Sequence, residues 1–273
     1  MTSSRTSRTS RTSSTGRALG TVLAAAAVAG PAVLLAPQAQ AASFTKIQGA
    51  AGSAAGLQPS VDAFRALLGG VDNGNNPSAP TGRREINWDA VPDAISSPAN
   101  MPNNLFNTTV PRGAVFSSPS NRFQVSASTT GPVAPRFGNV NPQYASVLSA
   151  FSQEKLFAPR GGVQTRVRFF VPGTSDRAYV SGFGAVFTDV DKARTTTIEL
   201  YDRWGARLWK GNVPKGTRAD GSLSFLGVKS GSARIAEVRI TTGNRPLSAA
   251  NADGGASDVV AIDDLVYGEP KPW

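Results

Sequence analysis

Short runs in which apolar and polar side chains alternate dominate the sequence after residue 82, and this period of two restricts the fold more than any other feature. Every second side chain of an extended strand points to the same face, so such runs predict strands with one buried face. In Arg122–Ala127, for example, Phe123, Val125 and Ala127 share a face. The same alternation occurs in Arg84–Asp89, Val163–Phe169, Tyr179–Asp189, Thr196–Tyr201, Leu223–Val228, Ala236–Ile240 and Val259–Tyr267.

Turn-forming residues separate these runs. The 273-residue chain contains 28 Gly and 19 Pro. Residues Asp202–Gly205 predict a hairpin turn between a strand ending at Tyr201 and one that contains Leu208. Many short strands joined by turns favour an all-β fold, so we expect an antiparallel β-sandwich or jelly roll over residues 82–270, with one short N-terminal helix.

The segment 42–81 lacks this alternation. It begins with small and polar residues, and we expect it to be flexible apart from one short helix at 60–68. Ser60 is the expected N-cap, and Gly69-Gly70 is expected to end the helix. The apolar face of this helix, which we expect to pack on the sandwich, consists of Val61, Phe64, Leu67 and Leu68.

The first 41 residues have the order of a secretory signal peptide. Residues 1–17 carry Arg but no acid, residues 18–36 are apolar, and Ala39-Gln40-Ala41 supplies the small residues of a cleavage site. The alternative is a membrane anchor, but Gly30-Pro31 interrupts the apolar run. We therefore expect cleavage after Ala41 and a secreted, extracellular protein without a stable membrane anchor.

Two residue types are missing. The chain has no Cys, which excludes disulfides, thiolate nucleophiles and zinc–thiolate sites. It has no His, which excludes a Ser–His–Asp triad, a histidine base and the usual His-ligated metals. Any enzymatic chemistry would have to use carboxylates, Lys, Tyr, Ser, Thr or a hard metal ion.

The positive charge is modest and dispersed. Four of the 28 basic residues precede residue 42, which leaves 24 basic and 18 acidic residues, a net charge of +6, in the remainder. A nucleic-acid surface would cluster this charge and interleave it with aromatics. We therefore expect no nucleic-acid partner.

Several segments resemble a mostly uncharacterised family of exported bacterial β-sandwich proteins, some of which carry a C-terminal PEP-CTERM sorting tail. The similar segments are Gly82–Pro92 (GRREINWDAVP), Leu105–Asn107, Arg112–Phe116, Gly182–Asp191 (GFGAVFTDVD) and Val260–Pro270 (VAIDDLVYGEP). The resemblance implies export and a β-sandwich, but no particular activity. Since the sequence ends at Trp273 without such a tail, we expect no covalent anchoring.

The first candidate site is acidic. Asp189 and Asp191 end one predicted strand, whereas Asp263 and Asp264 lie inside another and are expected to point to opposite faces. A buried carboxylate needs a partner, and Ca²⁺ takes several carboxylate and carbonyl oxygens. The hypothesis is a structural Ca²⁺ site, to which Asp253 and Asp258 in the preceding loop can contribute. The alternative is that these aspartates cap turns and pair with Arg194 or Arg177.

A second candidate combines Trp88 with Glu85, Asp89 and Asp93. An aromatic ring beside two carboxylates can stack on a sugar while the acids hydrolyse the glycosidic bond. The alternative is that Trp88 belongs to the core and that the acids form a solvated or ion-paired face.

The third candidate is an aromatic surface formed by Tyr201, Trp204 and Trp209 around the predicted hairpin. Exposed aromatics at a β-turn can bind glycans or a protein partner. The alternative is that Trp209 packs across the strands and that Trp204 covers the turn.

These observations favour an exported, non-catalytic β-sandwich protein with an extracellular binding or structural role. Its expected partner is an extracellular polysaccharide or a cell-surface protein. The alternative function is a carbohydrate-active hydrolase that uses Asp and Glu carboxylates.

Overall fold

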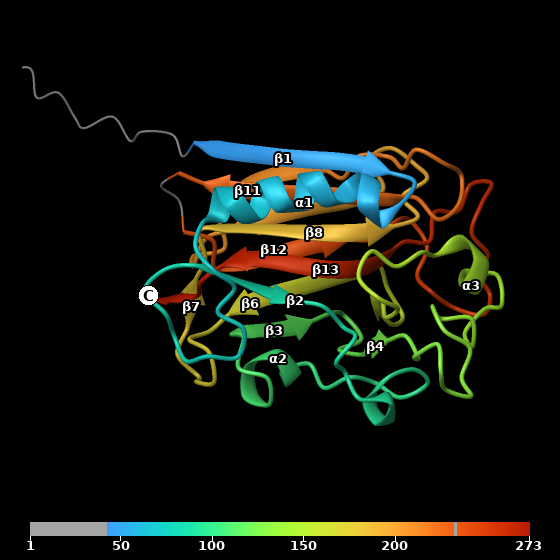
Figure 1. Ribbon diagram of the computed structural model, residues 1–273, viewed down its shortest axis with the longest axis horizontal. Helices are drawn as coiled ribbons and strands as arrows, with labels where there is room; N and C mark the ends of the chain where they lie inside the picture. The colour runs from blue at the N-terminus through green and yellow to red at the C-terminus, as the bar shows by residue number, and fades with distance from the viewer. Residues whose placement is uncertain (1–42, 232–233) are drawn as a thin grey trace, which may run out of the picture. The chain divides into compact units, whose positions relative to one another are not determined.

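The computed structural model describes residues 43–231 and 234–273, which form mainly antiparallel β-structure (Figure 1). The predicted signal peptide lies outside these residues. Within the described ranges, no helix is both long and apolar enough to cross a membrane.

Two antiparallel sheets make up most of the structure. The larger sheet has the order β1 (Phe44–Ala51), β11 (Leu223–Ser230), β8 (Gly182–Thr188), β13 (Ala261–Gly268), β5 (Phe157–Pro159), β4 (Phe123–Val125), and β2 (Arg83–Ile86) also pairs with β13. The smaller sheet has the order β10 (Arg207–Asn212), β9 (Thr197–Tyr201), β12 (Glu237–Thr241), β6 (Gln164–Phe169), β3 (Ala114–Ser117). A two-stranded ribbon joins β14 (Lys271–Pro272) to β7 (Ala178–Tyr179).

The two sheets bury one hydrophobic core between them. Alternate side chains of β8, β11 and β13 meet those of β6, β9 and β12 in one continuous cluster. Trp88 lies inside this cluster, with its ring stacked on that of Phe157 at 4.3 Å between centroids. The predicted β-sandwich is therefore confirmed. The strand order β5-β13-β8-β11 opposite β6-β12-β9-β10 is compatible with a jelly roll, which stays a prediction.

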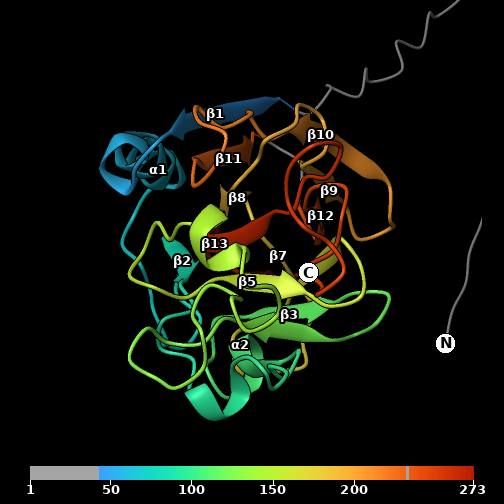
Figure 2. The same ribbon diagram turned by 90° about the vertical axis from the view of Figure 1, so that its right-hand side faces the viewer.

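Helix α1 (Ala54–Leu68) packs on the outer face of the larger sheet. Figure 2 shows this sheet between α1 and the strands β9, β10 and β12 of the smaller sheet. Glycines allow the close approach, because a Cβ at Gly184 or Gly227 would lie 2.8 or 2.6 Å from the ring of Phe64. The remaining helical segments are short: Asp93–Ile95 (3₁₀), α2 (Leu105–Thr108) and α3 (Tyr144–Val147).

Two expectations about the segment 42–81 are wrong. The helix begins at Ala54 rather than at Ser60, since Ser53 is the N-cap and its Oγ accepts a hydrogen bond from the amide of Gly56. Leu57 extends the buried face of Val61 and Phe64 by one turn, whereas Pro59 inside the helix suggests a later start in the sequence. The stretch expected to be flexible instead contains strand β1. Because β1 lies at the edge of the sheet, its side chains are exposed or half-buried, and its sequence does not alternate between apolar and polar residues.

A buried ion pair between Arg84 and Glu269 lies at the end of strand β13. Arg84 and Glu269 are both buried, and Arg84 Nε and Nη2 donate to the two carboxylate oxygens of Glu269 at 2.7 and 2.8 Å. The remaining guanidinium hydrogens bond to backbone carbonyls of Gly74, Asn76, Pro77 and Pro111. The pair thus ties the loop that follows α1 to strands β2 and β13.

Substitution Glu269→Gln should destabilise the fold by ~3–5 kcal/mol, because it leaves the Arg84 charge buried without a counter-charge. Urea unfolding measures this change. Asp62→Asn is the matched control: Asp62 is 56% exposed and pairs with Arg65 on the surface of α1, so it should cost at most ~1 kcal/mol. Equal effects of the two substitutions would contradict the role assigned to the buried pair.

Candidate functional site

Three aspartates converge beyond the end of strand β8. Asp189 and Asp191 follow the strand directly, and Asp253 comes from the loop between β12 and β13. One carboxylate oxygen from each of the three lies within 4.8 Å of the others. Asp191 and Asp253 also line a hollow of about 570 Å³, which gives solvent ions access to the cluster. We call these residues the acidic triad.

The triad contains carboxylate oxygens without hydrogen-bond donors. Asp189 is fully buried; its Oδ1 accepts a hydrogen bond from the amide of Gly221 at 3.1 Å, whereas its Oδ2 has no partner among the described residues. Oδ1 of Asp191 is likewise buried and without a partner there. Asp189 also has a φ of 68°, an uncommon backbone conformation for a non-glycine residue. Buried anionic oxygens without donors are costly unless a bound proton or a cation neutralises them.

Burial and mutual repulsion raise the pKa values in the triad. Burial, then the charges of Asp253 and Asp191, raise the pKa of Asp189 to about 9. Burial, then Asp253 and Asp258, raise the pKa of Asp191 to about 6. Hard cations favour several oxygen ligands and reverse this repulsion. The triad can therefore hold a metal ion.

Asp258 supports the triad from the same β12–β13 loop as Asp253. It is buried, and its Oδ1 accepts a hydrogen bond from the amide of Asp191 at 2.8 Å while Oδ2 accepts one from the hydroxyl of Thr195. Both oxygens are thus engaged in holding the turn after β8. Asp258 is better described as a positioning residue than as a ligand.

Asp263 and Asp264 do not join the triad. A β-bulge interrupts β13 between Ile262 and Leu265, so the expectation that the two side chains point to opposite faces is wrong. Oγ of Ser152 lies 2.9 Å from Oδ1 of Asp263 and 2.6 Å from Oδ1 of Asp264. These two residues form a separate acid pair. Among the described residues, the ion pairs of this protein do not join any of these aspartates to Arg194 or Arg177.

The residues of the proposed hydrolytic site have structural partners. Trp88 is buried and donates its indole N–H to the carbonyl of Asp263. Strand β2 ends at Ile86, so Glu85 and Asp89 do not share a strand face. Glu85 forms ion pairs with Arg65 and Arg83, and Asp93 forms one with Lys155. Asp89 accepts hydrogen bonds from the backbone amides of Glu154 and Lys155.

Two of the three aromatic candidates, Tyr201 and Trp204, line one hollow beside the β9–β10 hairpin, and Trp209 lies apart from them. Trp204 is 76% exposed at the turn, which is a hairpin as the sequence predicts. Trp209 does not lie beside Trp204. A bulge between Arg207 and Trp209 shifts the register of β10. The indole of Trp209 lies over Gly211 and packs against the hydrophobic core. Tyr201 is buried and donates its hydroxyl to Glu199 at 2.5 Å.

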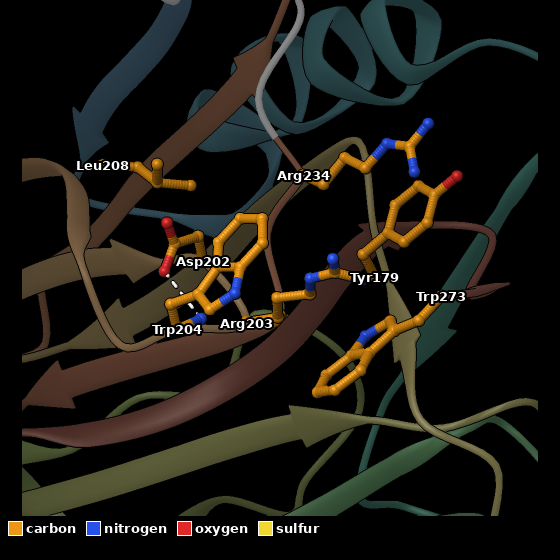
Figure 3. Close-up of a pocket in the computed structure, with 8 residues that line it drawn as sticks. Tyr179, Asp202, Arg203, Trp204, Leu208, Arg234 and Trp273 are labelled. Atoms are coloured by element: carbon orange, nitrogen blue, oxygen red, sulfur yellow. Dashed lines mark hydrogen bonds between the residues drawn. The ribbon is translucent and has the colours of Figure 1, made fainter.

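Trp204 instead lines a groove with aromatics from distant parts of the chain. Tyr179 of β7 and Trp273 line the same hollow of about 400 Å³, and Trp273 is 49% exposed. Figure 3 shows the indoles of Trp204 and Trp273 on either side of the Arg203 side chain, with Tyr179 beside Arg234. We call this hollow the aromatic groove. The sequence gives no local signal for Tyr179 or Trp273, since the β7–β14 pairing brings them there.

The fold and these sites define a disulfide-free antiparallel β-sandwich with an acidic triad that can hold a metal ion and an exposed aromatic groove. Comparisons of the chain with protein-family models, curated protein sequences and solved structures return no match.

The acid pair should make stability depend on pH. Burial, then the charge of Asp264, raise the pKa of Asp263 well above its ordinary value of 3.8, and burial also raises the pKa of Asp264. In the unfolded chain both carboxyls lose their protons near pH ~4, whereas the folded protein retains protons there. Unfolding therefore releases protons above this pH, and the free energy of unfolding falls as the pH rises.

Substitution Asp263→Asn should reduce the fall in the free energy of unfolding with rising pH, because the amide cannot ionise and still provides an N–H donor. Urea unfolding at pH 4.5 and pH 8 measures the difference. Asp176→Asn, at an exposed position, is the control and should leave the pH dependence unchanged. A pH dependence that is the same in Asp263→Asn and in the unsubstituted protein would contradict this assignment.

Proposed function

We propose that this protein is an exported, non-catalytic module that binds an extracellular polysaccharide in the aromatic groove and carries a structural Ca²⁺ in the acidic triad. The exposure of Trp204 and Trp273 in one groove is the observation that carries the binding function. Exposing an indole to water is unfavourable, and the faces of indole rings suit the apolar faces of sugars.

The shape of the surface favours a polysaccharide over a cell-surface protein. A stable protein interface buries ~800 Å² on each partner and has an apolar centre. The large apolar side chains exposed among the described residues are Val71, Trp204 and Trp273, and the two tryptophans share one groove. A hollow of about 400 Å³ with two exposed indoles fits a sugar chain better than a flat protein partner.

The contacts of the acids support a non-catalytic function. A glycoside hydrolase needs two carboxylates that converge on the bond to be cleaved. Glu85 and Asp93 form ion pairs, and Asp89 accepts hydrogen bonds from backbone amides. The exported location rests on the signal-peptide pattern of residues 1–41.

Calcium suits the acidic triad better than other metals do. The chain has no Cys or His, so zinc and the softer transition metals lack their usual ligands. Mg²⁺ requires near-octahedral geometry and retains most of its water, whereas Ca²⁺ accepts varied arrangements of carboxylate and carbonyl oxygens. The triad supplies three carboxylates, one of them fully buried.

Ca²⁺ at ~100 times its dissociation constant should stabilise the protein by ~2.7 kcal/mol and raise its melting temperature by several degrees. Thermal unfolding with Ca²⁺, with Mg²⁺ and with a chelator measures this shift. Asp189→Asn and Asp191→Asn should abolish the shift, whereas Asp263→Asn, outside the triad, should retain it. A missing shift, or one that persists in Asp189→Asn, would contradict the calcium site.

Trp204→Ala and Trp273→Ala should each weaken polysaccharide binding by about fivefold or more, since stacking of a nucleobase on an aromatic side chain contributes ~1–3 kcal/mol and a sugar face stacks in the same way. Affinity electrophoresis of the purified protein in gels that contain neutral or acidic polysaccharides measures the binding. Trp209→Phe is the matched control and should bind normally, because Trp209 lies outside the groove. Binding that is unaffected by both alanine substitutions would place the function elsewhere.

A further inference from the structure

Arginines line the aromatic groove and the hollow next to it. Arg203 and Arg234 line the groove itself. The adjoining hollow of about 530 Å³ shares Trp204 and Trp273 with the groove and adds Arg168, Arg177 and Arg239. The two hollows are thus lined by five arginines and by two acids, Asp202 and Glu237, so their side chains carry an excess of three positive charges.

Two of the five arginines share one carboxylate. The carboxylate of Glu237 bonds to Nε of Arg168 at 2.8 Å and to Nε of Arg239 at 2.6 Å. Asp202 uses its Oδ1 to accept hydrogen bonds from the amides of Trp204 and Ala206 within the hairpin turn. Its role is therefore to shape the turn that presents Trp204.

The other three arginines lack a carboxylate partner in the part of the chain that the structure describes. Arg177, Arg203 and Arg234 are exposed and form none of its ion pairs. Each guanidinium instead lies over an aromatic ring, with distances to the ring centroid of 4.7 Å for Arg177 on Phe170, 4.3 Å for Arg203 on Trp204 and 4.5 Å for Arg234 on Tyr179.

Stacking leaves these arginines ready to bind an anion. A guanidinium that stacks on a ring uses its flat face, so the N–H groups at its edge remain free for a two-point hydrogen bond to a carboxylate or sulfate. The stacking also restricts the side chain beforehand, which reduces the entropy lost on binding. Free cationic edges beside exposed indoles match a polymer that offers both a sugar face and an acidic group.

We propose that the groove selects an anionic polysaccharide, whose sugar rings contact Trp204 and Trp273 and whose carboxylate or sulfate groups are bound by Arg203, Arg234 and Arg177. This inference rests on the proposed polysaccharide-binding function and specifies the class of its ligand. The acidic groups provide the specificity, since neutral sugars leave the three guanidinium edges without an anionic partner.

The test compares polygalacturonate, dextran sulfate and neutral dextran as ligands of the purified protein by isothermal titration calorimetry. At least one of the two anionic polymers should bind about tenfold or more tightly than neutral dextran, and its affinity should fall as the salt concentration rises. The first two polymers distinguish a uronate ligand from a sulfated one. A single-stranded oligonucleotide of similar charge tests for indiscriminate binding of polyanions.

Arg203→Ala combined with Arg234→Ala should lower affinity for the anionic polymer about tenfold or more and leave the weaker binding to neutral dextran unchanged. Arg203→Lys should recover only part of the loss, because it keeps the charge but not the planar fork. Arg122→Ala, at an exposed position that does not line the groove, is the matched control. Thermal unfolding of each variant verifies that it is folded.

The outcomes separate the two proposals. Equal affinity for neutral and anionic polymers, with loss of both in Trp204→Ala, would overturn the anionic ligand and leave the polysaccharide-binding function intact. Binding of the oligonucleotide as tightly as the polysaccharides would overturn the inferred ligand class. An absence of binding to all three polysaccharides would overturn both proposals.

Discussion

The buried guanidinium of Arg84 holds together parts of the chain that the β-sandwich core does not join. It bonds to Glu269 just after β13 and to four backbone carbonyls, three of them in the loop between α1 and β2. Glu269 in turn accepts hydrogen bonds from Asn73 and from the amide of Ala79. In a chain without cysteine, this network does what a disulfide does in many small exported domains: it fixes a long loop against the sheet.

The same network influences the aromatic groove. Only Pro270 separates Glu269 from β14, and β14 pairs with β7, the strand that ends at Tyr179. Trp273 follows β14, and its amide donates to the carbonyl of Arg177. The positions of Tyr179 and Trp273 thus depend on the β7–β14 ribbon. The buried ion pair holds Glu269, which lies two residues before β14. Stability in this region and geometry of the groove are therefore linked.

The buried acids show how burial and function are related in this fold. A bulge places Asp263 and Asp264 side by side. Asp263 accepts a hydrogen bond from the amide of Phe151, and the hydroxyl of Ser152 lies within hydrogen-bond distance of both acids. In the acidic triad, by contrast, two buried carboxylate oxygens have no hydrogen-bond donor among the described residues: Oδ2 of Asp189 and Oδ1 of Asp191. The hydrogen bonds of the acid pair account for its burial, whereas the triad brings together carboxylate oxygens that a cation or a bound proton can neutralise. This contrast is why the triad supports a metal site and the pair does not.

The sequence by itself determined the all-β class, most of the strand positions and the hairpin at Asp202–Gly205, because a period of two is a local property of the chain. It also identified Asp189, Asp191 and Trp204, since acids at a strand end and an aromatic in a turn are visible locally. Only the tertiary structure decided that Asp253 completes the triad, that Asp263 and Asp264 stand apart, and that Trp273 and Tyr179 replace Trp209 beside Trp204. The β-bulges in β10 and β13 and the β7–β14 pairing depend on how strands pair with one another, which no pattern within a single strand encodes. The start of α1 is set locally instead, by the Ser53 cap.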